Sequence, residues 1–318
     1  MRPRSVTRRT VLALAAPVAL AAMLSGAPAM AQDLKIATSL PSLTFPFFVH
    51  MQNELNAEAA KLGGITVINN DGENSTPKQT AGVEAAVVSG VDGIVISPLD
   101  AVAMAPAVGA AVEAGVPVIT IDRRVEGVEV LGHVGADNVK GGEAQANLII
   151  ERFPDGAKIV NLQGQPGASP AIDRNQGLHN ILDGNDKYEF VAEQTANFAR
   201  EEGASVTEAI LAGLDSPPDI IVAANDDMAL GALQVVQEQG LKVAIIGFDA
   251  LPEALASVRD GGLLATIEQM PGGQSRLAMD EMVKFLREGV KPEPLVLLTP
   301  IAITKDNLDQ SERLGEAS

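Results

Sequence analysis

Polar side chains follow several apolar runs of this sequence at the points where the runs end. Asp122 and Arg123 directly follow one run, and Asn225, Asp249 and Gln269 stand at or near the ends of three others. Carboxylate, guanidinium and amide groups supply hydrogen-bond acceptors and forked donors, which neighbouring sugar hydroxyls require in a desolvated cleft. The residue types therefore indicate a binding site for a neutral, hydroxyl-rich molecule.

Each of these residues also has a purely structural explanation. Asn225 or Asp226 could cap a helix over 228–238, and Asp122 with Arg123 could form a local ion pair. One residue taken alone would not distinguish the two explanations. Four polar strand ends favour a shared site, because the carboxyl ends of parallel strands converge where ligands bind.

The aromatic residues are few, so their positions are informative. The chain has no Trp, one Tyr and eight Phe; Phe45, Phe47 and Phe48 surround Pro46 at the start of an expected helix, and Phe198 follows another apolar run. The C–H faces of a sugar ring pack well on aromatic planes. The same rings could equally belong to the hydrophobic core.

Short β-branched runs alternate with segments of helical spacing from Asp33 onward. The expected strands are 34–38, 65–69, 93–97, 116–121, 157–162, 188–193, 219–223, 242–247 and 264–268. Most are apolar on both faces, which is typical of parallel strands covered by helices on either side. The βαβα order predicts an α/β fold of open, doubly wound parallel sheets with right-handed crossovers, and the length favours two sheets.

The chain begins with a segment typical of an export signal. Four arginines and no acidic residue precede an apolar run at 11–24, and a small-residue cleavage site ends at Ala31. The run has 14 residues, fewer than the roughly 20 that a helix needs to cross a bilayer. A cleaved signal peptide at 1–31 is therefore favoured over a permanent anchor. Arg8 and Arg9 fit the twin-arginine export route, although an ordinary secretory signal could contain the same pair.

Charge and cysteine content narrow the classes of partner. Without the four arginines of the expected signal, 19 basic and 41 acidic side chains remain, a net charge near −22. Such a chain should repel nucleic acid and anionic membrane surfaces, and its field disfavours an anionic ligand. An exported chain with no cysteine needs enough buried core to fold without disulfides, which two domains of ordinary size provide.

The motifs of common enzymes are missing from the sequence. It has no Gly-x-Gly-x-x-Gly after the first expected strand, no Gly-x-Ser-x-Gly and no Cys, and the segment 164–169 lacks the Gly-Lys pair of a phosphate loop. Among its three histidines, His50 alone has metal-like spacing, to Glu54 four residues on, which more commonly marks a solvated helix pair. The sequence thus predicts no catalytic residue, no metal and no cofactor.

Over nearly all of residues 34–305 the chain resembles the ribose-binding-protein-like group of type I periplasmic binding proteins. The segments that carry the likeness are Pro46-Phe47-Phe48, Pro117 to Arg123, Asp137 to Gly142, Asn225 to Leu233, Val243 to Asp249 and Ala265 to Gln269. The resemblance implies two lobes joined by three hinge crossings, with a ligand cleft between them. By it, one lobe comprises 32–136 plus 270–297, and the other 137–269 plus 298–318.

The resemblance also implies which residues contact the sugar. They are Phe47, Phe48, Asp122, Arg123, Phe198, Asn225, Asp249 and Gln269. Two further positions in the expected site depart from the ribose pattern: Phe45 stands where it has Asn, and Ile172 where it has Arg. A ribose hydroxyl left without a partner there would cost about 1–3 kcal/mol. The expected ligand is therefore another pentose, a hexose, a deoxysugar or a linear polyol.

Partners and location follow from the same resemblance. It implies a monomeric periplasmic solute-binding protein that delivers its ligand to the membrane permease of an ABC transporter and does not span the membrane after signal cleavage. A sugar sensor that presents its closed form to a chemoreceptor or sensor kinase is the alternative. A sugar-responsive repressor would need a basic helix-turn-helix at the N-terminus, where this chain has the expected signal.

Overall fold

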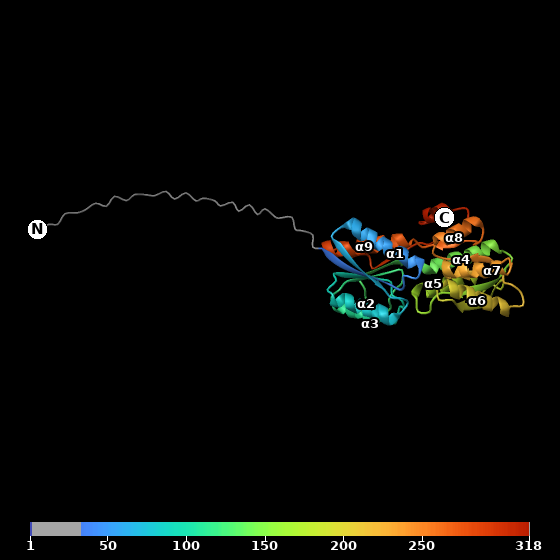
Figure 1. Cartoon of the computed structure of the whole chain (residues 1–318), viewed down its shortest axis with the longest axis horizontal. Coiled ribbons are helices and arrows are strands. Elements are labelled where there is room, and N and C mark those ends of the chain that lie inside the picture. Colours follow the sequence, from blue (N-terminus) through green and yellow to red (C-terminus); the bar gives the residue numbers. More distant parts are fainter. Residues whose placement is uncertain (2–32, 318) are drawn as a thin grey trace. The chain divides into compact units, whose positions relative to one another are not determined.

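The computed structural model describes Met1 and residues 33–317. The predicted signal peptide, its cleavage after Ala31 and its twin-arginine pair lie outside the described residues. Asp33–Ser318 form one compact unit, whose elements are labelled in Figure 1. Within the described part of the chain, every helix is too short or too polar to cross a bilayer.

The first sheet has six strands, and every neighbouring pair in it is parallel. Their order is β11-β5-β4-β3-β1-β2, with β1 Leu34–Leu40, β2 Ile65–Asp71, β3 Gly93–Ile96, β4 Val118–Ile121, β5 Gly132–Ala136 and β11 Leu295–Leu298. Helices α1 (Pro46–Leu62) and α9 (Pro271–Glu288) cover one face, and α2 (Thr76–Val88) and α3 (Ala105–Glu113) cover the other (Figure 1).

The second sheet has four parallel strands. Their order is β7-β6-β8-β9, with β6 Ala157–Gln163, β7 Tyr188–Thr195, β8 Ile220–Ala223 and β9 Ala244–Ile246. Its helices are α4 (Asn138–Arg152), α5 (Ser169–Leu182), α6 (Arg200–Gly213), α7 (Asp226–Glu238) and α8 (Pro252–Asp260). Helix α4 packs on α5, and α6 packs on α7. An antiparallel pair, β10 (Thr266–Glu268) and β12 (Ile301–Ile303), lies beyond β9.

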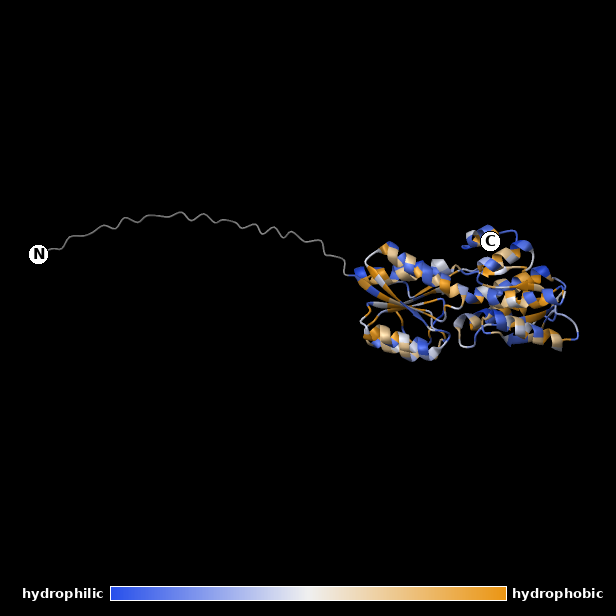
Figure 2. Ribbon diagram, viewed as in Figure 1, coloured by the Kyte–Doolittle hydropathy of each residue, from blue (hydrophilic) through white to orange (hydrophobic). Residues whose placement is uncertain are grey.

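The two parallel sheets confirm the predicted α/β fold. The prediction succeeded because the strands of these sheets are apolar. Every residue of β3, β4 and β8 is buried, as expected for strands covered on both faces. Figure 2 shows hydrophobic strands in the interior and hydrophilic residues on the outer faces of the helices. Each sheet with its helices is called a lobe below.

The chain passes between the lobes three times, as the resemblance implied. The first crossing leads from β5 into α4, the second from β10 into α9, and the third from β11 into β12. The first and third lie side by side, because the Asp137 backbone N–H donates to the Leu298 carbonyl at 2.9 Å. Met270, on the second crossing, has a φ of +55°, in the left-handed region that non-glycine residues seldom adopt.

Three strands were not predicted from the sequence. Strand β5 contains two glycines and a histidine, which weaken its apolar pattern; β11 is a partly exposed edge strand; and β12 has three residues. Edge strands and very short strands carry little of the periodicity that identifies buried ones. The polar segment after Asp306 forms two short 3-10 helices, η1 (Leu308–Gln310) and η2 (Leu314–Glu316).

A stability prediction follows from the close packing of α4 on α5. A Cβ on Gly177 would overlap the Val139 carbonyl oxygen, whereas a Cβ on Gly213 of α6 would meet open space. Gly177→Ala should therefore lower the free energy of unfolding by about 1–3 kcal/mol. Gly213→Ala is the control and should leave it unchanged or slightly raised. Equal denaturant midpoints for the two variants would contradict this packing.

Candidate ligand-binding site

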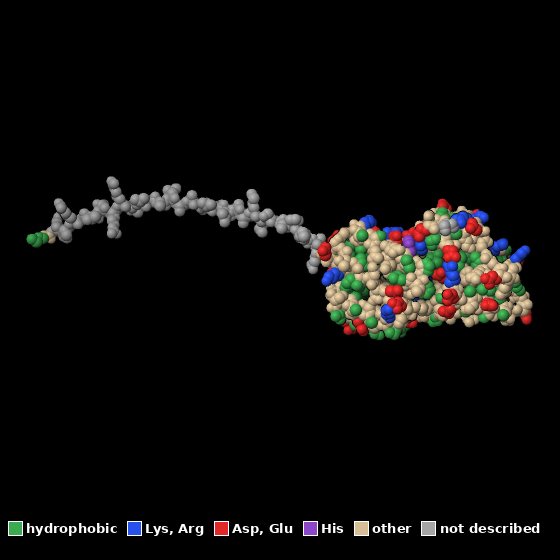
Figure 3. Space-filling view, in the orientation of Figure 1, with side chains coloured by type: hydrophobic (Ala, Val, Ile, Leu, Met, Phe, Trp, Pro, Cys, Tyr) green, Lys and Arg blue, Asp and Glu red, His purple; other side chains and the backbone are tan. Residues whose placement is uncertain are grey.

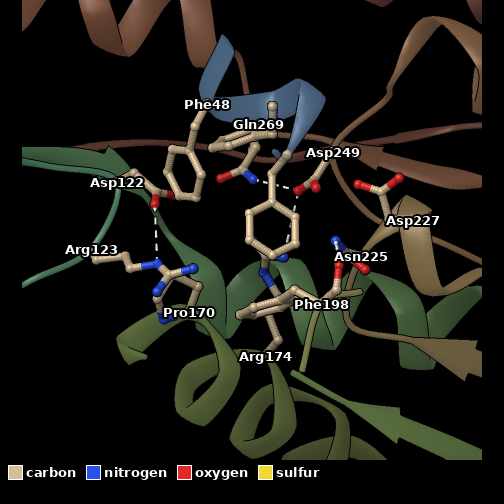
Figure 4. Close-up of a pocket in the computed structure, with 12 residues that line it drawn as sticks. Phe48, Asp122, Arg123, Pro170, Arg174, Phe198, Asn225, Asp227, Asp249 and Gln269 are labelled. Atoms are coloured by element: carbon tan, nitrogen blue, oxygen red, sulfur yellow. Dashed lines mark hydrogen bonds and ion pairs between the residues drawn. The ribbon is translucent and has the colours of Figure 1, made fainter. Parts of the chain in front are cut away.

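A cavity lies where the carboxyl ends of the strands of both lobes face each other (Figure 4). Including the space open to solvent, it holds about 370 Å³ free of protein atoms. Its lining residues are Phe45, Phe47, Phe48, Asp122, Arg123, Pro170, Arg174, Phe198, Asn225, Asp227, Asp249 and Gln269.

Of the ten residues predicted for the site, nine line this cavity and Ile172 does not. The Ile172 side chain is 52% exposed, while Pro170 and Arg174 of the same helix face the cavity. Positions two apart on a helix point about 200° apart, so Ile172 turns outward when its neighbours turn inward. Sequence reasoning missed Pro170, Arg174 and Asp227; the phase of the helix that carries Ile172 was the signal that could have identified Arg174.

In the first lobe, Asp122 and Arg123 directly follow β4. The Asp122 carboxylate accepts from Ser97 Oγ at 3.1 Å and lies 3.8 Å from Arg123 Nε. The Arg123 guanidinium donates to the Leu99 carbonyl at 2.8 Å and to Gln165 Oε1 of the second lobe at 3.1 Å. The local ion pair considered as an alternative therefore exists, and it stands inside the cavity.

Burial sets the charge state of this pair. It raises the pKa of Asp122, an effect that Arg123 partly offsets. It also lowers the pKa of Arg123 to about 10, with the Asp122 carboxylate opposing the shift. Arg123 thus remains a cation at neutral pH and stays available as a hydrogen-bond donor.

In the second lobe, Arg174 reaches the cavity from α5. Its Nε donates to Asn138 Oδ1 at 2.8 Å, its NH1 donates to the Ala224 carbonyl at 2.5 Å, and NH1 lies 3.5 Å from Asp249 Oδ1. The guanidinium also stacks 3.6 Å from the centre of the Phe248 ring, in range for a cation–π interaction. Four contacts therefore fix this buried cation.

Asp249 and Gln269 form a second polar pair next to Arg174 (Figure 4). Gln269 Nε2 donates to Asp249 Oδ1 at 2.6 Å. Burial raises the pKa of Asp249 to about 7, against the lowering effects of Arg174 and Gln269. The side-chain oxygen of Gln269, Oε1, is buried without a hydrogen-bond partner. Because Gln269 lines the cavity, this oxygen has an acceptor site available to a molecule bound there.

Asn225 combines the capping role with a place at the cavity. Its Oδ1 accepts from the Met228 backbone N–H at 3.0 Å and caps α7, while its Nδ2 donates to the Phe198 carbonyl at 3.0 Å. An amide has two acceptor and two donor sites. One of each therefore remains for a ligand, so the capping explanation and the binding explanation are compatible.

The aromatic side chains enter the cavity from both lobes. The Phe47 and Phe48 rings are 5.2 Å apart at 82°, and Phe45 meets Phe48 edge to face at 6.4 Å. The Arg123 guanidinium lies 5.3 Å from Phe48 and 5.6 Å from Phe198 of the second lobe. Phe47, Phe48 and Phe198 also belong to the main hydrophobic core, so each ring serves both the core and the cavity wall.

Hydrogen bonds and an ion pair join the two lobes beside the cavity. Arg124 of the first lobe pairs bidentately with Asp173 of α5, at 2.5 and 3.0 Å, and its backbone N–H donates to Ser169 Oγ at 2.9 Å. The Ala101 backbone N–H donates to the Gly167 carbonyl at 2.9 Å. These bonds join first-lobe loops to the start of α5, so the lobes are closed over the cavity.

No group of three or more acidic, His or Cys side chains is placed to hold a metal among the described residues. Glu54, considered with His50 as a metal-like pair, instead forms an ion pair with Arg276.

Two doubly wound parallel-sheet lobes around a shared polar and aromatic cavity define a type I periplasmic binding protein. Residues 36–289 match the model of the family described as periplasmic binding protein domain. The chain therefore belongs to this family, whose members are binding proteins and not enzymes.

Several relatives are similar along most of their length. The ribose import binding protein RbsB of Bacillus subtilis is 42% identical over 251 residues, which are 78% of this chain and 80% of that protein. The xylitol-binding protein of Mycolicibacterium smegmatis is 31% identical over 256 residues, 79% of this chain and 72% of that one. The structure of a Caulobacter myo-inositol binding protein bound to myo-inositol is 42% identical, with a TM-score of 0.85, covering 90% of this chain and 98% of that one.

The raised pKa of Asp249 predicts a pH-dependent difference in stability. Burial raises the pKa of Asp249 to about 7 from the usual 3.8, so the folded state favours the protonated side chain. The contribution of Asp249 to folding stability is therefore fully present below pH 3.8 and is lost as the pH rises through 7. Asp249→Asn keeps a neutral side chain at every pH. The melting temperature of the variant minus that of the unmodified protein should therefore increase from pH 4 to 8. Parallel melting curves of the two ligand-free proteins across that range would contradict it.

Proposed function

We propose that this chain is the solute-binding protein of an ABC importer, which captures a neutral monosaccharide or related polyol in the cavity and delivers it to the membrane permease. The observation that carries the proposal is the unpartnered, buried Gln269 Oε1 beside the Asp249–Arg174 pair. A ligand hydroxyl would satisfy that atom. The ligands named for the relatives, ribose, xylitol and myo-inositol, are all rich in hydroxyl groups.

The balance of charge in the cavity favours a neutral ligand. Arg123 faces Asp122, Arg174 faces Asp249, and Asp227 pairs with Arg200 at 3.3 Å. A charged ligand would enter a buried site in which every charge already has its counter-ion, and burying an uncompensated charge is expensive. Hydroxyl groups can share the remaining lone pairs and N–H groups without that penalty.

Within the class of neutral ligands, Phe45 is the residue that sets this cavity apart from the ribose pattern. Ile172 no longer bears on the choice, because it lies outside the cavity. Phe45 offers an apolar edge where a ribose hydroxyl would need a partner. A cyclic polyol such as myo-inositol, another pentose, a hexose, a deoxysugar or a linear polyol therefore suits the site better than ribose.

Ligand capture works by closure of two lobes, with boundaries at 32–136 plus 270–297 and at 137–269 plus 298–318. An open form binds the ligand on one lobe, and closure about the three crossings brings the hydrogen-bonding groups of the other lobe to it. Since closure buries the ligand, binding shifts the population toward the closed form by the difference in affinity of the two forms. The permease recognises the closed surface.

Export places the mature protein in the periplasm as a monomer, through the twin-arginine signal at 1–31. A second role, in which the closed form is presented to a chemoreceptor or sensor kinase, uses the same cavity. Nucleic acid is not a partner: the formal charge of −18 opposes it, and acidic and basic side chains are interspersed on the face drawn in Figure 3.

The ligand class is tested by thermal shift with pentoses, hexoses, deoxysugars and polyols. A ligand that binds only the folded state raises the melting temperature.

With the ligand so found, Asp249→Ala should weaken binding about tenfold or more, because ligand hydroxyls lose a partner, while the ligand-free protein stays folded. Calorimetry that finds unaltered affinity in the variant would remove Asp249 from the site, and a screen with no shift would refute the ligand class.

A second test addresses closure. Asp173 lies outside the cavity but pairs with Arg124 across the lobes, so Asp173→Asn should weaken ligand binding about twofold to fivefold, as expected for a partly exposed ion pair. Asp183→Asn is the matched control, since Asp183 pairs with His179 inside one lobe. Calorimetry should find wild-type affinity for the control; equal affinities for all three proteins would argue against this contact as part of closure.

A further inference from the structure

Asn138 is a buried amide placed between the first crossing and the cavity. It is the first residue of α4, directly after the crossing from β5, and its side chain is 2% exposed. Its Nδ2 donates to the Ala136 carbonyl at the end of β5 at 3.2 Å, and its Oδ1 accepts from Arg174 Nε at 2.8 Å. It does not line the cavity. One side chain thus joins the end of a first-lobe strand to a cavity-facing cation of the second lobe.

The Arg174 guanidinium is held by several contacts, so few substitutes for Asn138 would preserve its orientation. Its plane is held by Asn138 on Nε, by the Ala224 carbonyl on NH1 and by the Phe248 ring beneath it. The backbone of Arg174 is confined as well, because a Cβ on Gly142 of α4 would overlap the Arg174 carbonyl. A guanidinium presents its N–H groups in a rigid planar fork. Loss of the Nε partner would therefore turn the donors that face the cavity.

The location of Asn138 links this orientation to the path of the chain between the lobes. Its neighbour Asp137 donates through its backbone N–H to the Leu298 carbonyl, on the third crossing. Rotation of one lobe about these crossings would change backbone angles next to Asn138. The bond from Asn138 to Arg174 would then lengthen or turn with them.

We propose that Asn138 is the positioning residue that couples the orientation of the cavity-facing Arg174 guanidinium to the first crossing, so that ligand binding and lobe closure occur together. This inference rests on the proposed function, since it assigns a role within the same ligand site. It requires an acceptor oxygen at position 138 and no contact between that residue and the ligand.

Three variants test the proposal. Asn138→Leu removes the acceptor at nearly constant volume, Asn138→Asp keeps an acceptor oxygen for Arg174, and Asn161→Leu makes the same replacement at another buried amide of the second lobe. Asn161 bonds to Asn175 and Glu193 and does not line the cavity. Calorimetry with ribose and myo-inositol measures affinity, and X-ray scattering with and without ligand measures closure.

The expected result separates positioning from general stability. Asn138→Leu should bind at least tenfold more weakly and show a smaller ligand-induced decrease in radius of gyration. Asn138→Asp keeps the acceptor for Arg174 but loses the donor to the Ala136 carbonyl, so it should lose clearly less affinity than Asn138→Leu. Asn161→Leu should lower the melting temperature and keep the affinity. If Asn138→Leu fails to fold, Asn138→Ala takes its place.

Two results would count against the proposal, and a third would count against the proposed function. Wild-type affinity and closure in the variant that lacks the acceptor would overturn it, as would equal losses in Asn138→Leu and Asn138→Asp. Failure of the unmodified protein to bind ribose, myo-inositol or any member of the screening panel would instead overturn the proposed function on which the inference rests.

Discussion

The burial of two guanidinium groups at the junction of the lobes is the constraint on which the rest of the site depends. A buried cation is tolerated when it is paired and hydrogen-bonded, and each of these two has a carboxylate and hydrogen-bond acceptors beside it. Arg123 faces Asp122 and donates to a carbonyl, while Arg174 faces Asp249, donates to Asn138 and stacks on an aromatic ring. The partners come from different strand ends, so the cations are satisfied only when the strands of each lobe are correctly assembled.

The strand ends carry backbone strain where these partners sit. Asp122, Phe198 and Asp249 line the cavity and have φ values of +60°, +62° and +111°, each in a region that costs a non-glycine residue about 1–3 kcal/mol. Such conformations persist where surrounding packing determines them. The strands that lead into Asp122 and Asp249 are almost entirely buried, and this core holds the strained residues in position. The sheets therefore act as rigid supports for side chains whose local conformation is unfavourable.

The sequence was sufficient to predict the fold class and most of the cavity lining, for a physical reason. Buried parallel strands are continuous apolar runs, and the first polar residue after each run, such as Asp122 or Asn225, must lie at the edge where ligands bind. Side chains delivered by helices are harder to predict. Ile172 and Arg174 differ by two positions, and the side that faces the cavity depends on the phase of α5 against the sheet, which tertiary packing decides. Strand β5 was not predicted because its two glycines and its histidine interrupt the apolar pattern. These residues fit close packing in the fold, which the periodicity of the sequence does not show.

The ligand site and the crossings between the lobes share residues, and this bears on how binding could drive closure. Gln269 lines the cavity and belongs to the second crossing, where its carbonyl accepts from Gln274 Nε2 of α9 at 2.8 Å. Its neighbour Glu268 accepts from the Met270 backbone N–H at 2.6 Å and from two groups of the C-terminal segment, at 3.0 and 3.1 Å. The unpartnered oxygen of Gln269 thus stands on a segment that both lobes hold firmly. A ligand hydroxyl that donates to this oxygen would bind directly to the second crossing. Because the chain bends at this crossing when the lobes close, that hydrogen bond would stabilise the closed arrangement.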